Sequence, residues 1–251
     1  MLRIEIDGGT PTTDQLAVGL LANYGHFTAM QVRDQRVQGL DLHLRRLDAQ
    51  HRELYGTGLA GDRVRALIAK ALGDVRDAAV RVIAFGPDSP KLMVVVRPPV
   101  PRPDRPQRLV SVDYQRPLPH VKHIGGFGQL LHGNRARAAG YDDALLTTPD
   151  GVVIEGAIAN IAFFDHEGGI VWPEANWLHG VSMQLLEQHL PYRRAVVRKA
   201  DLTSYRGAFL SNSIGVTPVS GIDDVDYKID EPAMTRVRAA LEAVPWDAVD
   251  E

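Results

Sequence analysis

The sequence predicts an α+β protein of two domains, and three observations lead to this fold class. Residues 97–106, RPPVPRPDRP, hold five prolines in ten positions, which neither a helix nor a central strand tolerates. The chain before this stretch reads as strand, helix, helix and hairpin, and the chain after it holds many short strands. We therefore expect a small N-terminal α+β domain over residues 1–103 and a larger domain over residues 104–251.

The N-terminal part carries two helices and a hairpin. Leu44, Leu47, His51 and Leu54 recur at helical spacing, and Gly56 follows as a stop signal. A second helix is predicted from Asp62 to Leu72. The apolar stretches 80–85 and 92–96 flank GPDSPK, which predicts a hairpin.

The C-terminal part predicts a curled sheet or barrel with helices around it. A helix is expected from Phe127, with Phe127, Leu130, Leu131 and Ala138 as its apolar face and Gly140 at its end. The short apolar stretches after it, with a Pro-Asp-Gly turn between the first two, are typical of strands with tight turns. The predicted strands are 143–148, 151–156, 158–164, 169–172 and 207–213, with an extended segment at 195–200, and the predicted helices are 180–190 and 231–244.

Composition narrows the classes of function. The chain has no cysteine, which excludes thiol catalysis and cysteine-ligated zinc and fits a cytoplasmic protein. The net charge of −3 gives no sign of a nucleic-acid partner. The first residues do not resemble a signal peptide, and no apolar run approaches the ~20 residues that span a bilayer. A small-molecule ligand is the expected partner, with no membrane.

The stretch HVKHIGGFGQ at 120–129 holds one of only five lysines in a chain with 23 arginines. His120 and His123 are three residues apart, which places them on opposite faces of an extended segment, so we expect no metal site. The glycines lack the G-x-G-x-x-G spacing and the βαβ setting of a dinucleotide loop.

Lys122 is the candidate nucleophile. It lies between Val121 and Ile124, at the end of a predicted buried strand, where an ammonium is costly. Burial favours the neutral amine, which can attack a carbonyl and form a Schiff base. The alternative is a lysine that reaches solvent beside Gly125 and has no chemical role.

A pyridoxal phosphate enzyme also needs an acid facing the pyridine nitrogen and an anion site for the phosphate. Glu155 follows an apolar strand, where an inward carboxylate needs a cationic partner. Gly180, Val181 and Ser182 begin a predicted helix, whose first N–H groups could hold phosphate. Residues 211–213, Ser-Asn-Ser, form a second loop rich in donors, and Arg46 could add a permanent charge. Taken singly, these are more often a turn, a helix cap and a solvated arginine.

The order of these residues resembles the fold-type IV, or class IV, pyridoxal-phosphate-dependent aminotransferase family. That family includes branched-chain and D-amino-acid aminotransferases and 4-amino-4-deoxychorismate lyase. The resemblance runs from about Tyr24 to Val219 and depends most on ARAAGYDDALLTTPDGVVIEGAIANIAFF at 136–164. The supporting motifs are HLRRL at 43–47, Lys122, LHGVSM at 178–183 and SNSIGVTPV at 211–219.

The resemblance implies a role for each matching residue. Lys122 would form the Schiff base and carry the Cα proton of the substrate, and Glu155 would face the pyridine nitrogen of pyridoxal 5'-phosphate. The phosphate would be held by Arg46, Val181, Ser182, Ser213 and Ile214. Asn160 would support local structure. Members of the family are generally homodimers with active sites near the subunit interface.

Three departures leave the substrate class open. Phe127 stands where aminotransferases of the family often have a tyrosine. Phe27-Thr28-Ala29 replaces F-E-T or F-E-G, which removes an acid on the substrate side. The stretch 211–219 is one residue shorter than the S-x-T-x-x-E-I-T-P-V pattern and lacks its glutamate.

The resemblance favours an aminotransferase that moves an amino group between an amino acid or amine and a 2-oxo acid. The first alternative is 4-amino-4-deoxychorismate lyase, which eliminates pyruvate and leaves 4-aminobenzoate. The second is a non-catalytic relative, because Phe127 and Thr28 depart from the pattern.

Overall fold

The computed structural model describes residues 2–250, and the chain forms two compact units. Unit 1 comprises residues 1–101, 121–125 and 244–251, and unit 2 comprises residues 102–120 and 126–243. The division predicted from sequence cuts the chain once, between 103 and 104. In the structure the chain instead passes between the two units four times, because a short central segment and the C-terminal residues belong to unit 1.

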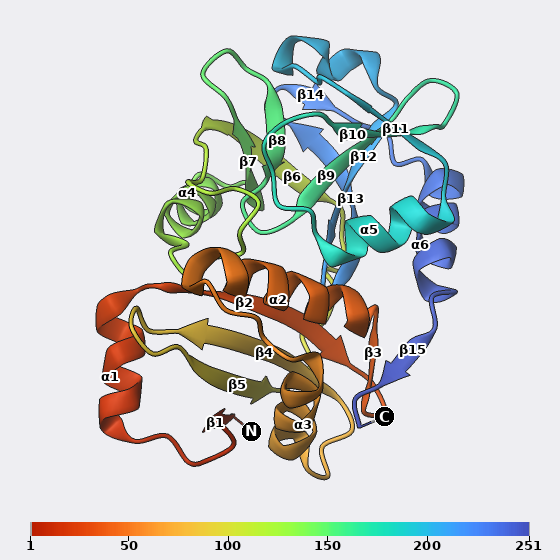
Figure 1. Ribbon diagram of the computed structural model, residues 1–251. Coiled ribbons are helices and arrows are strands. Elements are labelled where there is room, and N and C mark those ends of the chain that lie inside the picture. Colours follow the sequence, from red (N-terminus) through yellow and green to blue (C-terminus); the bar gives the residue numbers. More distant parts are fainter. Residues whose placement is uncertain (1, 251) are drawn as a thin grey trace. The chain divides into compact units, whose positions relative to one another are not determined.

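Unit 1 contains a four-stranded antiparallel sheet in the order β1-β5-β4-β2. Its strands are β1 (Arg3–Ile6), β2 (Gly25–Val32), β4 (Ala78–Phe85) and β5 (Lys91–Arg97), and its helices are α1 (Thr13–Ala22), α2 (Leu40–Tyr55) and α3 (Gly61–Leu72). The predicted hairpin is β4 and β5, and the two predicted helices are α2 and α3. Leu44 and Leu47 of α2 and Ile68 of α3 share one core with the strands, so these helices cover one face of the sheet (Figure 1).

The last described residues complete unit 1. β15 (Trp246–Ala248) pairs antiparallel with β3 (Arg36–Gln38). Asp247 Oδ2 accepts a hydrogen bond of 3.0 Å from the backbone nitrogen of Leu40. Gly39 at the N-cap of α2 has no side chain to cap the helix, so Asp247 supplies that acceptor from the other end of the chain.

Unit 2 is built on a nine-stranded sheet in which the strands run β11-β10-β9-β12-β13-β6-β7-β8 and β14 pairs with β13. The strands are β6 (Gln107–Asp113), β7 (Asp143–Thr147), β8 (Val153–Gly156), β9 (Asn160–Phe164), β10 (Ile170–Pro173), β11 (Tyr192–Ala195), β12 (Gly207–Asn212), β13 (Gly215–Ile222) and β14 (Val225–Asp226). The β13–β6, β6–β7 and β10–β11 pairs are parallel, and the other pairs are antiparallel.

Both faces of this sheet are buried. Ile161 and Phe163 of β9 enter the core on one face, and Ala162 and Phe164 enter the core on the other. The second core also contains residues of α5 (Val181–His189) and α6 (Glu231–Glu242), so these helices cover that face (Figure 1). Burial on both faces explains why 143–164 reads as nearly continuous apolar runs.

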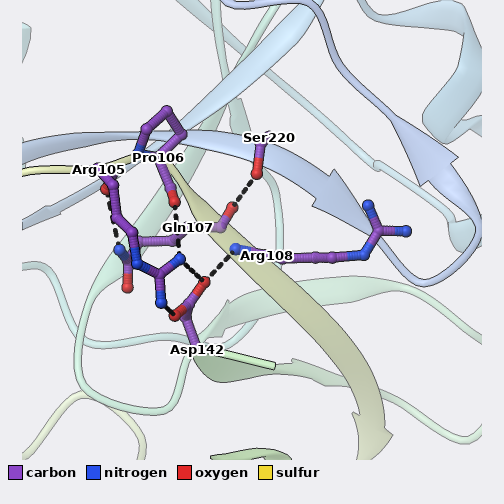
Figure 2. A network of polar contacts seen from close by, with 6 residues as sticks. All are labelled: Arg105, Pro106, Gln107, Arg108, Asp142 and Ser220. Carbon is purple, nitrogen blue, oxygen red and sulfur yellow. Dashed lines mark hydrogen bonds and ion pairs between the residues drawn. The ribbon is translucent and has the colours of Figure 1, made fainter. Parts of the chain in front are cut away.

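A polar network fixes the start of β6, the strand that precedes the loop toward Lys122. Asp142 Oδ2 accepts from the backbone nitrogen of Arg108 at 2.8 Å and from Arg105 Nη1 at 3.0 Å. Ser220 Oγ of β13 donates to the carbonyl of Gln107 at 3.3 Å. Figure 2 shows how these residues tie the strand to both of its neighbours.

Two details of the predicted unit 2 were wrong. Helix α4 (Phe127–Ala138) exists, but Phe127 is 76% exposed and Leu130 is 57% exposed, whereas Gly133 and Ala136 are buried. The helix packs through its small residues because a Cβ at Gly128 would lie 2.2 Å from the Tyr114 ring. The extended segment predicted at 195–200 is confirmed only up to Arg198, which forms an isolated bridge with Val152, because a 3₁₀ helix begins at Lys199 and runs to Ser204.

Among residues 2–250, no helix has the length and apolar character needed to cross a membrane.

Candidate functional site

The segment around Lys122 lies along the open edge of β2 in unit 1. Phe27 N donates to the carbonyl of Lys122 at 2.8 Å, and Ile124 N donates to the carbonyl of Gly25 at 3.0 Å. The backbone nitrogen of Lys122 donates to Gln50 Oε1 of α2 at 3.1 Å. The predicted strand is therefore wrong, because only an isolated bridge between His26 and His123 forms, but the backbone of Lys122 is held on both sides.

The side chain of Lys122 is half-buried and lies against an aromatic ring. Its Nζ is 4.9 Å from the centroid of Phe27, and the guanidinium carbon of Arg81 is 4.6 Å from the same centroid. The face of an aromatic ring attracts a cation, so Phe27 is a contact that helps to place the end of the Lys122 side chain.

Arg46 belongs to a polar cluster on the other face of β2. Arg46 Nη2 donates to Thr28 Oγ1, and Thr28 Oγ1 lies 2.6 Å from His43 Nδ1. The pKa of His43 lies well below its usual range, because the ring is buried and because Arg46 and Lys122 repel an added proton. The threonine hydroxyl accepts from Arg46 and donates to the neutral imidazole, which places the His43 proton on Nε2. Arg46 is therefore the permanent cation of this cluster.

Glu155 is a buried carboxylate at the end of β8 in unit 2, and it has a cationic partner there. Arg116 Nε lies 3.3 Å from Glu155 Oε1, and the two side chains are 5% and 7% exposed. Leu178 N donates to Glu155 Oε2 at 3.4 Å. The sequence pattern indicated that Glu155 would need a cation but did not identify Arg116, which lies in an irregular proline-containing loop.

The start of α5 has the features of an anion site. Gly180 at its N-cap provides no side-chain cap for the first N–H groups of the helix, where the positive end of the helix dipole also lies. Ser182 Oγ donates to the carbonyl of Asn212 at 2.6 Å, which joins the helix to the β12–β13 loop. Ile214 N donates to Asn212 Oδ1 at 3.0 Å.

One buried polar atom beside this loop lacks a partner. Ser211 is 1% exposed, and its Oγ has no hydrogen-bond partner among the described residues. A buried hydroxyl without a partner is costly, so a ligand with acceptor oxygens would satisfy it. Ser211 Oγ and the first N–H groups of α5 fit a phosphate group, whereas Ser182 Oγ and Ile214 N donate to Asn212 in this structure and would have to exchange that partner for a phosphate oxygen.

A short turn connects the two halves of the unit 2 site. Asn160 Nδ2 donates to the carbonyl of Leu178 at 2.7 Å, and Leu178 N reaches Glu155 as described above. A Cβ on Gly180 would lie 2.2 Å from Asn160 Oδ1. Asn160 therefore positions the residues that lead into α5, which agrees with the supporting role expected for it.

The predicted site residues fall into two groups. Lys122 and Arg46 lie in unit 1, where the charges of both contribute to the lowered pKa of His43. Glu155, Val181, Ser182, Ser213 and Ile214 lie in unit 2. The assignment of all seven to one cofactor stays a prediction.

Comparisons with known proteins identify the same resemblance. Residues 25–222 match a family model described as amino-transferase class IV. No curated protein matches this chain.

Solved structures show the same fold. A putative 4-amino-4-deoxychorismate lyase from Legionella pneumophila is 21% identical with a TM-score of 0.84, and the match covers 94% of this chain and 96% of that one. A PLP-bound hypothetical aminotransferase from Mycobacterium tuberculosis is 20% identical with a TM-score of 0.82, covering 96% and 98%. A fold IV transaminase from Curtobacterium pusillum is 20% identical with a TM-score of 0.79, covering 90% and 88%.

Proposed function

Because this chain belongs to the class IV aminotransferase family, whose members are pyridoxal-phosphate-dependent enzymes, we propose that it moves an amino group between an amino acid or amine and a 2-oxo acid. The donors at the start of α5 and the buried Glu155 fit the two ends of pyridoxal phosphate. The observation that carries the proposal is the turn at 178–180, which links Glu155 to the anion site through Leu178.

Each residue has a defined task in this proposal. Lys122 attaches the cofactor and moves the proton at the substrate Cα, and its fixed backbone limits where the amine can reach. Glu155 accepts a hydrogen bond from the pyridine nitrogen. The backbone of Val181, with Ser182, Ser213 and Ile214, binds the phosphate, and Arg46 adds positive charge. When bound, the cofactor supplies the electron sink that makes the Cα proton acidic.

An absorbance measurement tests the attachment. The protein loaded with pyridoxal phosphate should show a visible band that borohydride abolishes, and peptide mapping should place the reduced label on Lys122. A protein that stays colourless with added cofactor, or a label on Lys199, would contradict the proposal.

Removal of the amine separates attachment from binding. Lys122→Ala should lower kcat by at least ~10²-fold, because the proton transfer loses its positioned base. Cofactor should still bind through its phosphate, which an equilibrium dialysis measurement checks. Lys199→Ala is the matched control, since Lys199 lies in the 3₁₀ helix beside Asp223 and should keep full turnover.

A second candidate is a lyase that releases pyruvate and 4-aminobenzoate from 4-amino-4-deoxychorismate. The structural likeness to the putative lyase named above favours it, as do Thr28 and Phe127 at the positions noted. Pyruvate and 4-aminobenzoate formed without any amino acceptor would replace the aminotransferase proposal with this one.

We also propose that the protein is a homodimer. Phe127 and Leu130 of α4 and the nearby Ile158 are 76%, 57% and 63% exposed, and Gln129 Nε2 of α4 donates to Ala157 O beside them. An apolar patch of this kind suits a subunit contact with active sites near it. Light scattering after size exclusion would measure the mass. We further propose a cytoplasmic location, which the absence of cysteine supports and cell fractionation would test.

A further inference from the structure

Arg116 and Glu155 form an ion pair in the interior of unit 2, where removing both charges from water costs free energy. Both side chains are almost completely buried, and Nε lies 3.3 Å from Oε1. The free-energy cost of desolvating two charges often exceeds the energy of their mutual attraction. A contribution to stability therefore does not by itself explain a buried ion pair. Burial indeed lowers the pKa of the Arg116 guanidinium, while Glu155 and Tyr114 oppose that shift.

Further contacts hold the pair in one orientation. Arg116 Nη2 donates to the carbonyl of Pro119, which fixes the arginine within the loop that follows β6. On the glutamate, Arg116 faces Oε1 and Leu178 N donates to Oε2. The carboxylate is thus oriented by a cation on one oxygen and by the turn that leads to α5 on the other.

We propose that Arg116 is a positioning residue for the cofactor: it holds Oε1 of Glu155 and keeps the carboxylate ionised, so that Glu155 can accept a hydrogen bond from the pyridine nitrogen. This inference rests on the proposed function. Without the arginine, the buried carboxylate would lose this cation, and burial would then favour its protonated form more strongly. A protonated Glu155 would be a weaker hydrogen-bond acceptor for the pyridine nitrogen.

A double-mutant cycle on cofactor binding tests this role. Pyridoxamine phosphate is the probe, because it lacks the aldehyde and its binding does not depend on a bond to Lys122. Arg116→Met should raise its Kd by at least ~10-fold, as loss of an outer supporting contact typically does. The same change in a Glu155→Gln background should have little effect, because the amide has no charge to keep.

A spectroscopic readout distinguishes positioning from structural support. In the protein loaded with pyridoxal phosphate, Arg116→Met should shift the pH at which the visible band changes. Arg116→Lys, which keeps a cation, should show a smaller shift. It is also the variant to measure if Arg116→Met does not fold. Arg137→Met is the matched control: Arg137 lies 3.8 Å from the buried carboxylate of Asp143 in the same unit, and its loss should leave Kd and spectrum unchanged.

The outcomes separate the two proposals. If wild-type protein binds neither pyridoxamine phosphate nor pyridoxal phosphate, the proposed function and this inference both fail. If wild-type protein binds them, the role of Arg116 alone is overturned by either of two results. In one, Arg116→Met weakens binding equally in the wild-type and the Glu155→Gln backgrounds, and in the other it does not weaken binding at all.

Discussion

At the scale of single residues, the buried histidine pair of unit 1 makes stability depend on pH. His26 is 0% exposed, and its Nε2 lies 3.2 Å from Nδ1 of His51 on α2. Burial, then the nearby His51 and Arg46, lowers the pKa of His26 to about 3. One ring must donate and the other accept, and because the pKa of His51 is lowered as well, mainly by burial, both rings are neutral near pH 7.

Acid should therefore unfold the protein through His26. Its folded pKa is below its unfolded value of about 6.5, so only the unfolded chain takes up this proton as pH falls from 6.5 toward 3. Stability is then lost as pH falls, by about 2 kcal/mol for His26 between pH 7 and pH 5. Urea unfolding at those two pH values should show a smaller difference for His26→Gln than for wild type.

His166→Gln, at an exposed position, is the control and should keep the wild-type dependence on pH. Equal slopes for wild type and His26→Gln would show that this pair does not determine acid sensitivity.

At the scale of elements, the entry to α5 depends on a close fit between Gly180 and Asn160. Gly180 has φ −64° and ψ 146°, which any residue can adopt, so its backbone does not require glycine. The restriction is steric, because a Cβ would come within 2.2 Å of Asn160 Oδ1. Either Asn160 must release Leu178 or the start of the helix must move.

Gly180→Ala should consequently weaken both folding and cofactor binding. We expect a loss of about 1–3 kcal/mol in the free energy of unfolding, the usual cost of overpacking, and a higher Kd for pyridoxamine phosphate. Denaturant unfolding and a binding titration measure the two effects. Asn160→Ala in the same chain removes the clash, so the double variant should be more stable than additive losses predict.

Gly61→Ala is the matched control, since a Cβ there meets Leu44 Cδ1 at an ordinary 3.5 Å. Additive losses for Gly180 and Asn160 would mean that the two residues do not constrain each other.

The elements that the sequence predicted are those with a strong local pattern. The spacing of Leu44, Leu47 and Leu54 predicted α2, and the Pro-Asp-Gly turn predicted β7 and β8. Helix α1 was not predicted, because its apolar residues do not form one buried face: Leu20 and Leu21 are each 82% exposed. Helix α4 was predicted, but its buried face was not, because Phe127 and Leu130 are exposed.

For the candidate site, the sequence indicated residue types but not long-range partners. Lys122, Glu155 and the start of α5 followed from residue chemistry and from the order of motifs. The pairing of His123 with His26 and of Arg116 with Glu155 joins residues far apart in the chain, and no local periodicity encodes such contacts. In the sequence, Thr28 is only the residue that stands where the family pattern has an acid. Its hydrogen bonds to Arg46 and His43 are visible only in the structure.

At the scale of the whole molecule, a residue near the end of the sequence caps the helix that carries Arg46. Asp247→Ala should lower the free energy of unfolding by about 1 kcal/mol, because the amide of Leu40 loses its acceptor. Asp250→Ala is the control and should be close to neutral. Thermal unfolding would check both, and equal stability of the Asp247 variant and wild type would show that the cap contributes nothing measurable.

The interleaving of the units also bears on how the protein is made. Residues 244–251 belong to unit 1, yet the ribosome synthesises them after all of unit 2. Until they emerge, β3 lacks its partner strand and α2 lacks its acceptor at Leu40. A nascent chain can therefore complete unit 2 first, and the helix that carries Arg46 reaches its final stability only after β15 and Asp247 have been synthesised.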